Sequence, residues 1–412
     1  MHQYHQFIYK FGVLGAAILL LSGCMLGPGS LKNSRTFYNR AVQETAQEEF
    51  LLNLVRMRYD QSVEFMQVPS ITGQYNYQLG LASTAYKPDL TLQSKPTIVY
   101  TPEQGQEFNQ RLLSPIQNET ISLLASKGCR IDRVLMLVVQ NINDVENATS
   151  AGGPTPSTRP VFEEFLYFTK RMRALQNADH SFEITNKLKV TDASQAGDPI
   201  PLNQIDGEDQ LLAAEKGYRF HVSDDKTSAT LWKNETKTNG KVLRFASSAQ
   251  DNFDVEAICN ILELDPSLKE FWINSDLDGQ LLLPNGRRNA NAAPNNRDEL
   301  IVSTRSLKEI MYFLSQAIDV PRAHVNKGFV RETIDPATGC PFDWQEIFDE
   351  LFQVHSGELP PLHAAVSIRY RGHWFFIADS DIDSKRTFNL LLELFNLKIR
   401  AGGGAQIPLL TI

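Results

Sequence analysis

ITGQYNYQL, residues 71–79, alternates apolar and polar residues without a break. Such alternation is typical of a β-strand with one face buried and the other in water. A second strand is expected around 97–100, where TIVY is again rich in β-forming residues. The stretch therefore predicts sheet in the first quarter of the chain.

Helices are expected on both sides of these strands. Residues 34–59 carry apolar side chains every three or four positions and basic ones in the last turn, which indicates an amphipathic helix. After the strands, Thr101 and Pro102 resemble a helix start, with the threonine as cap and the proline at the first helical position. This helix is expected to kink at Pro115 and to end at Gly128.

The rest of the chain is interpreted with the same two patterns, alternation for strands and a spacing of three or four residues for helices. The apolar run VLMLVV at 134–139 predicts a central strand covered on both faces. Strands separated by polar turns and by one long insert, 191–210, suggest an antiparallel meander. The expected helices are 162–175, 306–318 and 384–397, and the expected strands are 182–190, 218–222, 229–232, 242–245, a hairpin at 364–378 and the apolar tail 407–412.

These elements predict an α+β protein, with mostly antiparallel sheet and helices packed on it, in one large or two interleaved domains. Polar loops at 141–160 and 284–296 separate the predicted regions. The regions are a signal peptide at 1–23, a flexible, lipidated tether at 24–34, an N-terminal α+β region at 35–150, a central strand-rich region at 161–283, and a C-terminal α+β region at 300–412 that can form one domain with 35–150.

The N-terminus has the three parts of a secretory signal. A polar start with one cation, Lys10, precedes the apolar run FGVLGAAILLL at 11–21, which is too short to anchor the mature chain across a bilayer. The run ends in Leu-Ser-Gly-Cys at 21–24, which resembles the lipobox of bacterial lipoproteins. The alternative is an ordinary signal peptide that has a cysteine after its small residues.

The resemblance implies a specific modification. In bacterial lipoproteins a peptidase cuts before the cysteine, here between Gly23 and Cys24. Cys24 then carries diacylglycerol on its sulfur and a fatty acid such as palmitate on its amino group. Two or more acyl chains hold a protein on a membrane essentially permanently. Met25 follows, in place of the aspartate that retains enteric lipoproteins at the inner membrane, so the resemblance implies the outer membrane of a Gram-negative envelope.

Four longer stretches resemble segments of uncharacterised proteobacterial lipoproteins. The family implies the membrane anchor and adds no catalytic residue. The stretches are LLNLVRMRYDQSVEFMQVPSITGQYNY at 51–77, DRVLMLVVQNIN at 132–143, RYRGHWFFIADSDIDSKRTFNLLLELFNL at 369–397 and GGGAQIPLLTI at 402–412.

Composition narrows the possible partners. The chain is 42% hydrophobic and 21% charged, which is typical of a globular protein, and its net charge is −8. Mild acidity without a long basic run argues against nucleic acid and against electrostatic docking on anionic lipid. After Cys24, Cys129, Cys259 and Cys340 remain, of which two could form a disulfide in an exported protein. No pair has metal-site spacing, and neither a metal nor a cofactor is expected.

Two acidic stretches resemble calcium loops but depart from the pattern. Residues 379–383 (DSDID) lack the loop glycine and the distal glutamate, so we expect Asp381 or Asp383 to cap the following helix. Residues 274–279 (NSDLDG) have the glycine but lack the glutamate, and expected strands flank them. An Asp-Gly hairpin turn is expected there.

One nucleophilic arrangement is conceivable, namely Cys340 with His355, His363 or His373. No family signature surrounds Cys340, so these histidines are expected to be ordinary strand or turn residues. Motifs of serine hydrolases, P-loop proteins, dinucleotide-binding proteins and zinc proteases are absent from the sequence, and the glycines at 402–404 precede an expected strand rather than a helix.

Aromatic residues repeat on one face of two expected strands. Tyr75 and Tyr77 form one such pair, and Trp374 and Phe376 form the other. They could line a ligand groove or a partner surface, but aromatic residues that share a strand face more often belong to the core.

The expected function is therefore non-enzymatic. We interpret the chain as a lipid-anchored envelope protein that binds a protein partner or scaffolds an assembly at the outer membrane. Two alternatives stay open: an envelope hydrolase that acts on peptidoglycan, glycan or lipid through carboxylates scattered in the sequence, and a carrier of a small apolar ligand. A cleft with converging acids would favour the hydrolase, and a closed apolar cavity would favour the carrier.

Overall fold

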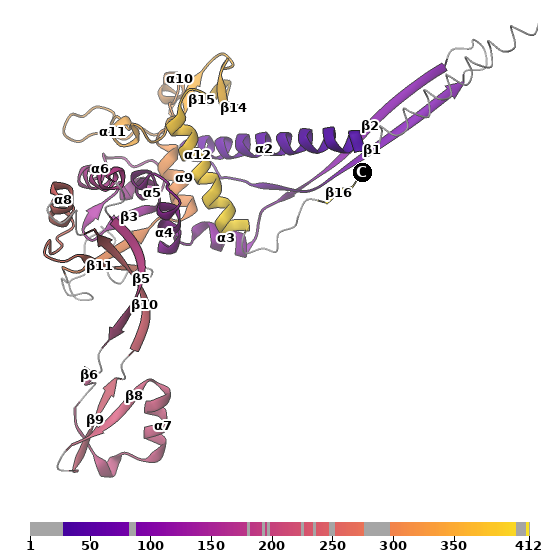
Figure 1. Ribbon diagram of the computed structural model, residues 1–412. Helices are drawn as coiled ribbons and strands as arrows, with labels where there is room; N and C mark the ends of the chain where they lie inside the picture. Colours follow the sequence, from indigo (N-terminus) through magenta and orange to yellow (C-terminus); the bar gives the residue numbers. More distant parts are fainter. Residues whose placement is uncertain are drawn as a thin grey trace, which may run out of the picture. The chain divides into compact units, whose positions relative to one another are not determined.

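The structure, a computed structural model, describes residues 28–81, 88–178, 182–191, 194–195, 198–223, 226–233, 236–246, 252–275, 297–400 and 409–411. Within these ranges the fold is α+β, which confirms the predicted class, and the strands pair mostly antiparallel in four sheets (Figure 1). The chain divides into two compact units. Unit 1 comprises Met1–Ser114, Ser150–Arg159 and Leu307–Ile412, and unit 2 comprises Pro115–Thr149 and Pro160–Ser306.

The two units are interleaved along the sequence. The region 35–150 is divided between them, and both ends of the sequence contribute to unit 1. In the described ranges, no helix combines the length and the apolar composition that crossing a bilayer requires.

Unit 1 is built on the helix α2 (Pro28–Arg58). Leu51, Leu54 and Val55 have no exposed surface, because their spacing of three and four residues places them on one side of the helix. The helix packs against α9 (Leu307–Ser315) and β14 (Ala364–Tyr370). The other helical segments of unit 1 are α3 (Gln106–Leu113), α10 (Arg322–Asn326), α11 (Gln345–Phe348), α12 (Ile382–Phe395) and the π-helical η4 (Asn396–Arg400), while the 3-10 helix η1 (Thr149–Gly152) begins at the boundary with unit 2.

A long ribbon of two strands belongs to the same unit. β1 (Met66–Leu81) and β2 (Pro88–Pro102) pair antiparallel (Figure 1), and β16 (Leu409–Thr411) pairs parallel with β1 at 70–72. The predicted strands at 71–79 and 97–100 are therefore confirmed, as is the strand in the C-terminal tail over 409–411. A β-bulge between Gln67 and Ser70 interrupts the register at the start of β1.

The second sheet of unit 1 contains the predicted hairpin. It has the order β13 (His355–Gly357), β15 (His373–Ala378), β14, and all its pairs are antiparallel. Arg371 and Gly372 form the turn with positive φ angles of 47° and 90°, as a tight hairpin turn requires. In β15, Phe375 and Ile377 have no exposed surface, whereas Trp374 and the other even-numbered residues are half-buried.

Unit 2 has a six-stranded mixed sheet in the order β4-β3-β12-β11-β10-β5, in which only β11 and β12 are parallel. A smaller sheet groups β8, β9, β7 and β6. The strands are β3 (Val139–Ile142), β4 (Val145–Glu146), β5 (Phe182–Thr191), β6 (Ser194–Gln195), β7 (Ile200–Pro201), β8 (Tyr218–Val222), β9 (Ser228–Lys233), β10 (Thr236–Phe245), β11 (Glu270–Ser275) and β12 (Glu299–Thr304).

The helices of unit 2 pack on the large sheet and on one another. α5 contacts α4 and α6, and α6 also contacts α8. The helical segments are α4 (Asn118–Ser126), α5 (Ile131–Val138), α6 (Glu163–Asn177), η2 (Leu202–Gln204), α7 (Gly207–Glu215) and α8 (Phe253–Ile261).

Three predictions about secondary structure are wrong. The run VLMLVV at 134–139 is helical up to Val138, because other helices and the sheet bury α5 on nearly every side and a helix buried in this way is apolar throughout. The helix predicted from Thr101 to Gly128 is two helices. Thr101 and Pro102 are the last two residues of β2, and Pro115 forces Ser114 into an extended conformation (φ −73°, ψ 144°) that ends α3.

The meander is the third error. β8 and β9 do form an antiparallel hairpin, but they belong to the small sheet, whereas β5 pairs with β10 in the large one. Part of the polar insert 191–210 enters α7, which begins with a capping box between Asp206 and Asp209. That box was readable in the sequence.

Candidate functional site

The predicted lipidation site lies outside the described residues. This holds for Cys24, for the cleavage position after Gly23 and for the whole signal segment 1–23. The described chain begins with Pro28 as the first residue of α2, within the segment 24–34 that the sequence predicts to be a tether. A proline suits the first helical position because its φ angle is already helical and its missing N–H has no partner there anyway.

The acidic stretch at 379–383 caps a helix, as predicted. Asp381 accepts hydrogen bonds from the amide (3.0 Å) and the hydroxyl (2.5 Å) of Ser384 at the start of α12. Asp379 forms an ion pair with Lys385 at 2.9 Å. These carboxylates therefore have protein partners. Of the second stretch, 274–275 end β11, while the predicted Asp-Gly turn at 278–279 lies outside the described residues.

The cysteines and histidines do not form a catalytic arrangement of the predicted kind. Cys340 is an exposed free thiol, and Cys259 is a buried free thiol whose pKa burial raises to about 11. His355 lies 3.5 Å from the carboxylate of Asp319, and His363 is exposed. Among the described residues, no group of three or more histidine, cysteine or acidic side chains could hold a metal ion.

The third histidine, His373, belongs to a cluster of side chains that the sequence did not reveal. The hydroxyl of Tyr59, at the end of α2, lies 2.7 Å from Nδ1 of His324 on α10. The ring of His373 lies 4.7 Å from that of His324, and the guanidinium of Arg371 stacks 5.3 Å from the ring centre of Tyr59. Tyr59 and His324 are 4% exposed each, so the pair joins α2, α10 and the β14–β15 turn rather than facing solvent.

The surroundings of this cluster favour a neutral histidine. Burial lowers the pKa of His324, and the charges of His373, Lys327 and Arg371 lower it further. Burial also raises the pKa of Tyr59 to about 12, with the neighbouring Tyr370 adding to the effect. The phenol therefore stays protonated, and the tautomer of the neutral imidazole sets which of the two groups donates the hydrogen bond between the Tyr59 hydroxyl and Nδ1.

This cluster should make unit 1 less stable in mild acid. A histidine with a lowered pKa takes up its proton in the unfolded chain first, so its contribution is complete above about pH 6.5 and is lost as the pH falls from there toward the folded-state pKa. His324→Asn keeps an acceptor for Tyr59 and removes the titration. We expect urea unfolding at a series of pH values between about 7 and 5 to show a flatter profile for this variant than for the wild type. The exposed His363→Asn is the matched control, and equal slopes for all three proteins would contradict the assignment.

Unit 1 also contains a polar groove, which is our candidate binding site. Its volume is about 480 Å³, within the range of ordinary ligand pockets. The loop after α2, the end of β2, the helix α3 and the helix α9 form its walls. Glu64, Glu103 and Lys308 supply charged groups, and Phe65 and Phe108 supply apolar surface.

The buried side-chain amide of Asn53 holds the loop that forms part of this groove. Asn53 has no exposed surface and binds Glu64 twice, donating to its carbonyl (2.6 Å) and accepting from its amide (3.3 Å). The amide of Glu103 donates to the carbonyl of Phe65 at 2.8 Å, which joins the loop to the end of β2. Gly105, with φ 111°, then turns the chain into α3, a conformation that glycine adopts without strain.

Lys308 and Tyr312 close the groove from α9. They lie one helical turn apart, and the ammonium group of Lys308 is 6.0 Å from the centre of the Tyr312 ring. Burial and the charge of Asp60 raise the pKa of Tyr312, so its phenol is neutral. The groove thus offers two carboxylates, one ammonium and a neutral phenol together with apolar side chains, a combination that suits a peptide segment with an apolar and a basic side chain.

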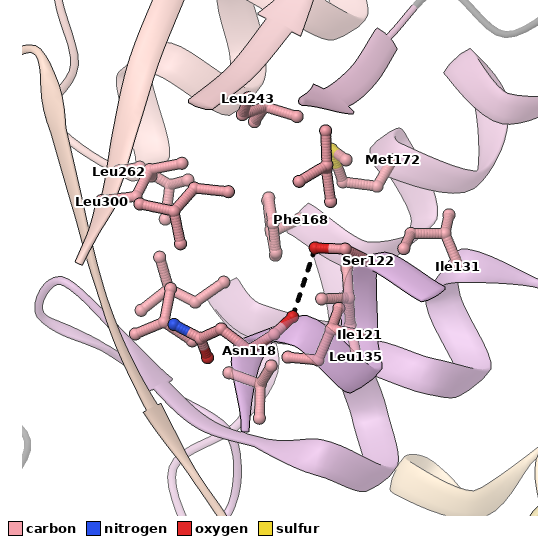
Figure 2. Close-up of a pocket in the computed structure, with 15 residues that line it drawn as sticks. Asn118, Ile121, Ser122, Ile131, Leu135, Phe168, Met172, Leu243, Leu262 and Leu300 are labelled. Atoms are coloured by element: carbon pink, nitrogen blue, oxygen red, sulfur yellow. Dashed lines mark hydrogen bonds between the residues drawn. The ribbon is translucent and has the colours of Figure 1, made fainter. Parts of the chain in front are cut away.

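A second hollow lies inside unit 2 and is apolar. It has a volume of about 60 Å³ between the six-stranded sheet and the helices α4, α5 and α6. Figure 2 shows that the labelled side chains around it are apolar except for Asn118 and Ser122, and Asn118 is itself bonded to Ser275 at 2.7 Å. An apolar cavity that binds benzene has a volume of about 150 Å³, more than twice the volume of this hollow. This hollow is a gap in core packing, and it gives the carrier hypothesis no support.

The candidate sites were mostly invisible in the sequence. Neither Asn53 nor the Tyr59–His324 pair belongs to a motif. The one readable signal was an asparagine between the buried positions of an amphipathic helix, which requires a hydrogen-bond partner. No protein-family model, no curated protein and no solved structure matches this chain.

Proposed function

We propose that this chain is a lipid-anchored cell-envelope protein that binds a protein partner, or scaffolds an assembly, at the outer membrane. The observation that carries the proposal is the sequence Leu-Ser-Gly-Cys at 21–24, directly after the apolar run 11–21. Cys24 is the residue expected to carry the lipid, and Met25 is compatible with transfer to the outer membrane. The chemistry of the proposal is attachment and binding, without a catalytic step.

The groove of unit 1 supports the binding part of the proposal. It is larger than the hollow of unit 2, it is polar, and both of its glutamates lie on chain segments held by backbone hydrogen bonds. A preorganised polar groove loses little conformational entropy when it binds. With two carboxylates against one ammonium, it should prefer a partner segment of positive charge.

The test is purification of the full-length protein, expressed with its own leader in a Gram-negative host, from detergent-solubilised membranes. We expect the intact mass to show acylation of Cys24 and a stoichiometric partner to co-purify. Cys24→Ser should be found in the aqueous fraction without the partner, whereas Cys340→Ser, which removes an exposed thiol in unit 1, should behave like the wild type. Met25→Asp should move the acylated protein to the inner-membrane fraction.

A charge reversal in the groove separates binding from anchoring. Glu103→Lys should weaken co-purification by about tenfold, as loss of one close charge pair does, and leave the protein acylated and membrane-bound. An unacylated wild-type protein would refute the anchor. An acylated protein that elutes alone would refute the partner, and assays for hydrolysis of peptidoglycan and glycan would then be the next step.

A further inference from the structure

The ribbon of β1 and β2 separates its residues by polarity. Its register places Tyr77 opposite Leu92 and Leu79 opposite Leu90, whereas Gln74 lies opposite Lys95. Because successive residues of a strand belong to opposite faces, the two kinds of pair occupy different faces of the ribbon. The charged residues of the two strands are Asp89 and Lys95, and both occupy the polar face.

The ribbon has few neighbouring elements within the described ranges. β1 and β2 make their main contacts with each other and with β16, and no other helix or strand of the described ranges packs extensively against them. At the base of β2, Ile98 and Tyr100 share the apolar face and are 41% and 60% exposed. A two-stranded ribbon of this kind is marginally stable in water, since it lacks both a core and partners for its outer edges.

The length of the ribbon fits a bilayer. β1 has 16 residues and β2 has 15, so at about 3.3 Å per residue each strand extends about 50 Å. A strand that crosses the hydrocarbon core of about 30 Å needs about 10 residues, and its residues alternate between lipid and a polar environment. The alternation of β1 from Ile71 to Leu81 meets both conditions.

We propose that this ribbon inserts into a lipid bilayer with its apolar face against the acyl chains. Unpaired backbone N–H and C=O groups are not tolerated in lipid, so inserted ribbons of neighbouring copies pair edge to edge. β16 occupies the edge of β1 only at 70–72, and β2 is an edge strand of the described sheet, so both edges have room for a second copy. This goes beyond the lipid anchor, which requires no protein in the hydrocarbon.

The experiment uses the full-length acylated protein in phosphatidylcholine vesicles. Cys129 and Cys340 are first replaced by serine, and single cysteines are introduced one at a time at positions 74 to 79 and labelled with an environment-sensitive dye. Labels at Tyr75, Tyr77 and Leu79 should be quenched by a nitroxide lipid about twofold more than labels at Gln74, Asn76 and Gln78, because alternate residues face different media. Leu79→Lys should abolish this pattern, and Gln78→Lys, which adds the same charge on the polar face, should not.

The outcomes separate this proposal from the lipid anchor. Vesicle flotation reports the anchor and does not depend on the ribbon. If the protein floats but quenching is equal at odd and even positions, or absent at all of them, the insertion is refuted and the anchor stands. If chemical cross-linking shows only monomers while the quenching alternates, the edge pairing between copies is refuted. If the labels at the odd positions enter an apolar environment only on addition of a protein partner, and the nitroxide lipid does not quench them, the apolar face docks on protein instead of lipid and the insertion is refuted.

Discussion

Arg305→Ala is expected to destabilise unit 2 by about 3–5 kcal/mol, because several buried carbonyls lose their donor at about 1–3 kcal/mol each. The side chain of Arg305 has no exposed surface. Its guanidinium donates to the carbonyls of Met136 (2.8 Å), Leu137 (3.3 Å) and Val139 (3.0 Å), and also to that of Asn147. The first three are at the C-terminal end of α5, where backbone carbonyls lack partners within the helix.

Two effects add in this variant. The carbonyls lose a charged donor in a place that water does not reach, at about 1–3 kcal/mol for a buried group left unsatisfied. The helix also loses the cation that balances the negative end of its dipole. Asn147 donates to Met136 and Val139 as well, at 2.9 and 2.7 Å, so it should compensate in part. A double-mutant cycle between Arg305 and Asn147 should therefore be non-additive.

Urea unfolding followed by hydrogen exchange of peptides from 131–147 measures this loss within unit 2. Arg305→Lys should fall between wild type and alanine, because an ammonium group cannot reach so many carbonyls at once. Arg322→Ala is the control, since its side chain in unit 1 is 85% exposed. A loss below about 1 kcal/mol for Arg305→Ala would contradict the capping role.

Phe395→Ala should cost unit 1 a comparable 3–5 kcal/mol, the usual range for emptying a buried aromatic site. Phe395 on α12 is 3% exposed, and its ring centre lies 4.7 Å from that of Phe50 on α2 and 4.8 Å from that of Phe65 before β1. The rings of Phe50 and Phe65 are 5.1 Å apart, so each ring contacts the other two. The cluster connects segments from both ends of the sequence.

The effect should extend to the candidate groove, because Phe65 is one of its walls. Thermal unfolding of the variant should show the loss, and amide exchange at 61–65 should accelerate well before global unfolding. Phe37→Ala is the matched control on the same helix α2, where the ring is 75% exposed, and a change within about 0.5 kcal/mol is expected. If the two variants were equally stable, the aromatic cluster would not be part of the core of unit 1.

Period-two patterns were the part of the fold that the sequence predicted well. The strand at 71–79 and the hairpin at 364–378 were recognised because alternation has no helical counterpart. Alternation alone does not determine which face of a strand is buried. Phe375 and Ile377 form the inner face of β15, because the register pairs them with the buried Ile368 and Val366. Aromatic content alone would have placed Trp374 and Phe376 on that face.

Long-range contacts account for the errors. The run 134–139 contains only apolar residues, so it has no period that separates a buried strand from a buried helix. Pro115 was expected to kink one helix, but the chain passes from unit 1 to unit 2 there and Pro115 forms a β-bridge with Ser306. No local sequence signal shows that the chain leaves one compact unit and enters the other at a given residue.

The sequence by itself determined the α+β class, the strand alternation and the cap of α12, because each depends on residues within a few positions of one another. The expectation of a lipid on Cys24 is local in the same way. Only the tertiary structure decided the groove, the Tyr59–His324 pair and the position of Arg305, since each joins residues more than 100 positions apart in unit 1 or unit 2. Close approach between distant segments follows from the packing of complete helices and sheets, and a linear pattern does not encode it.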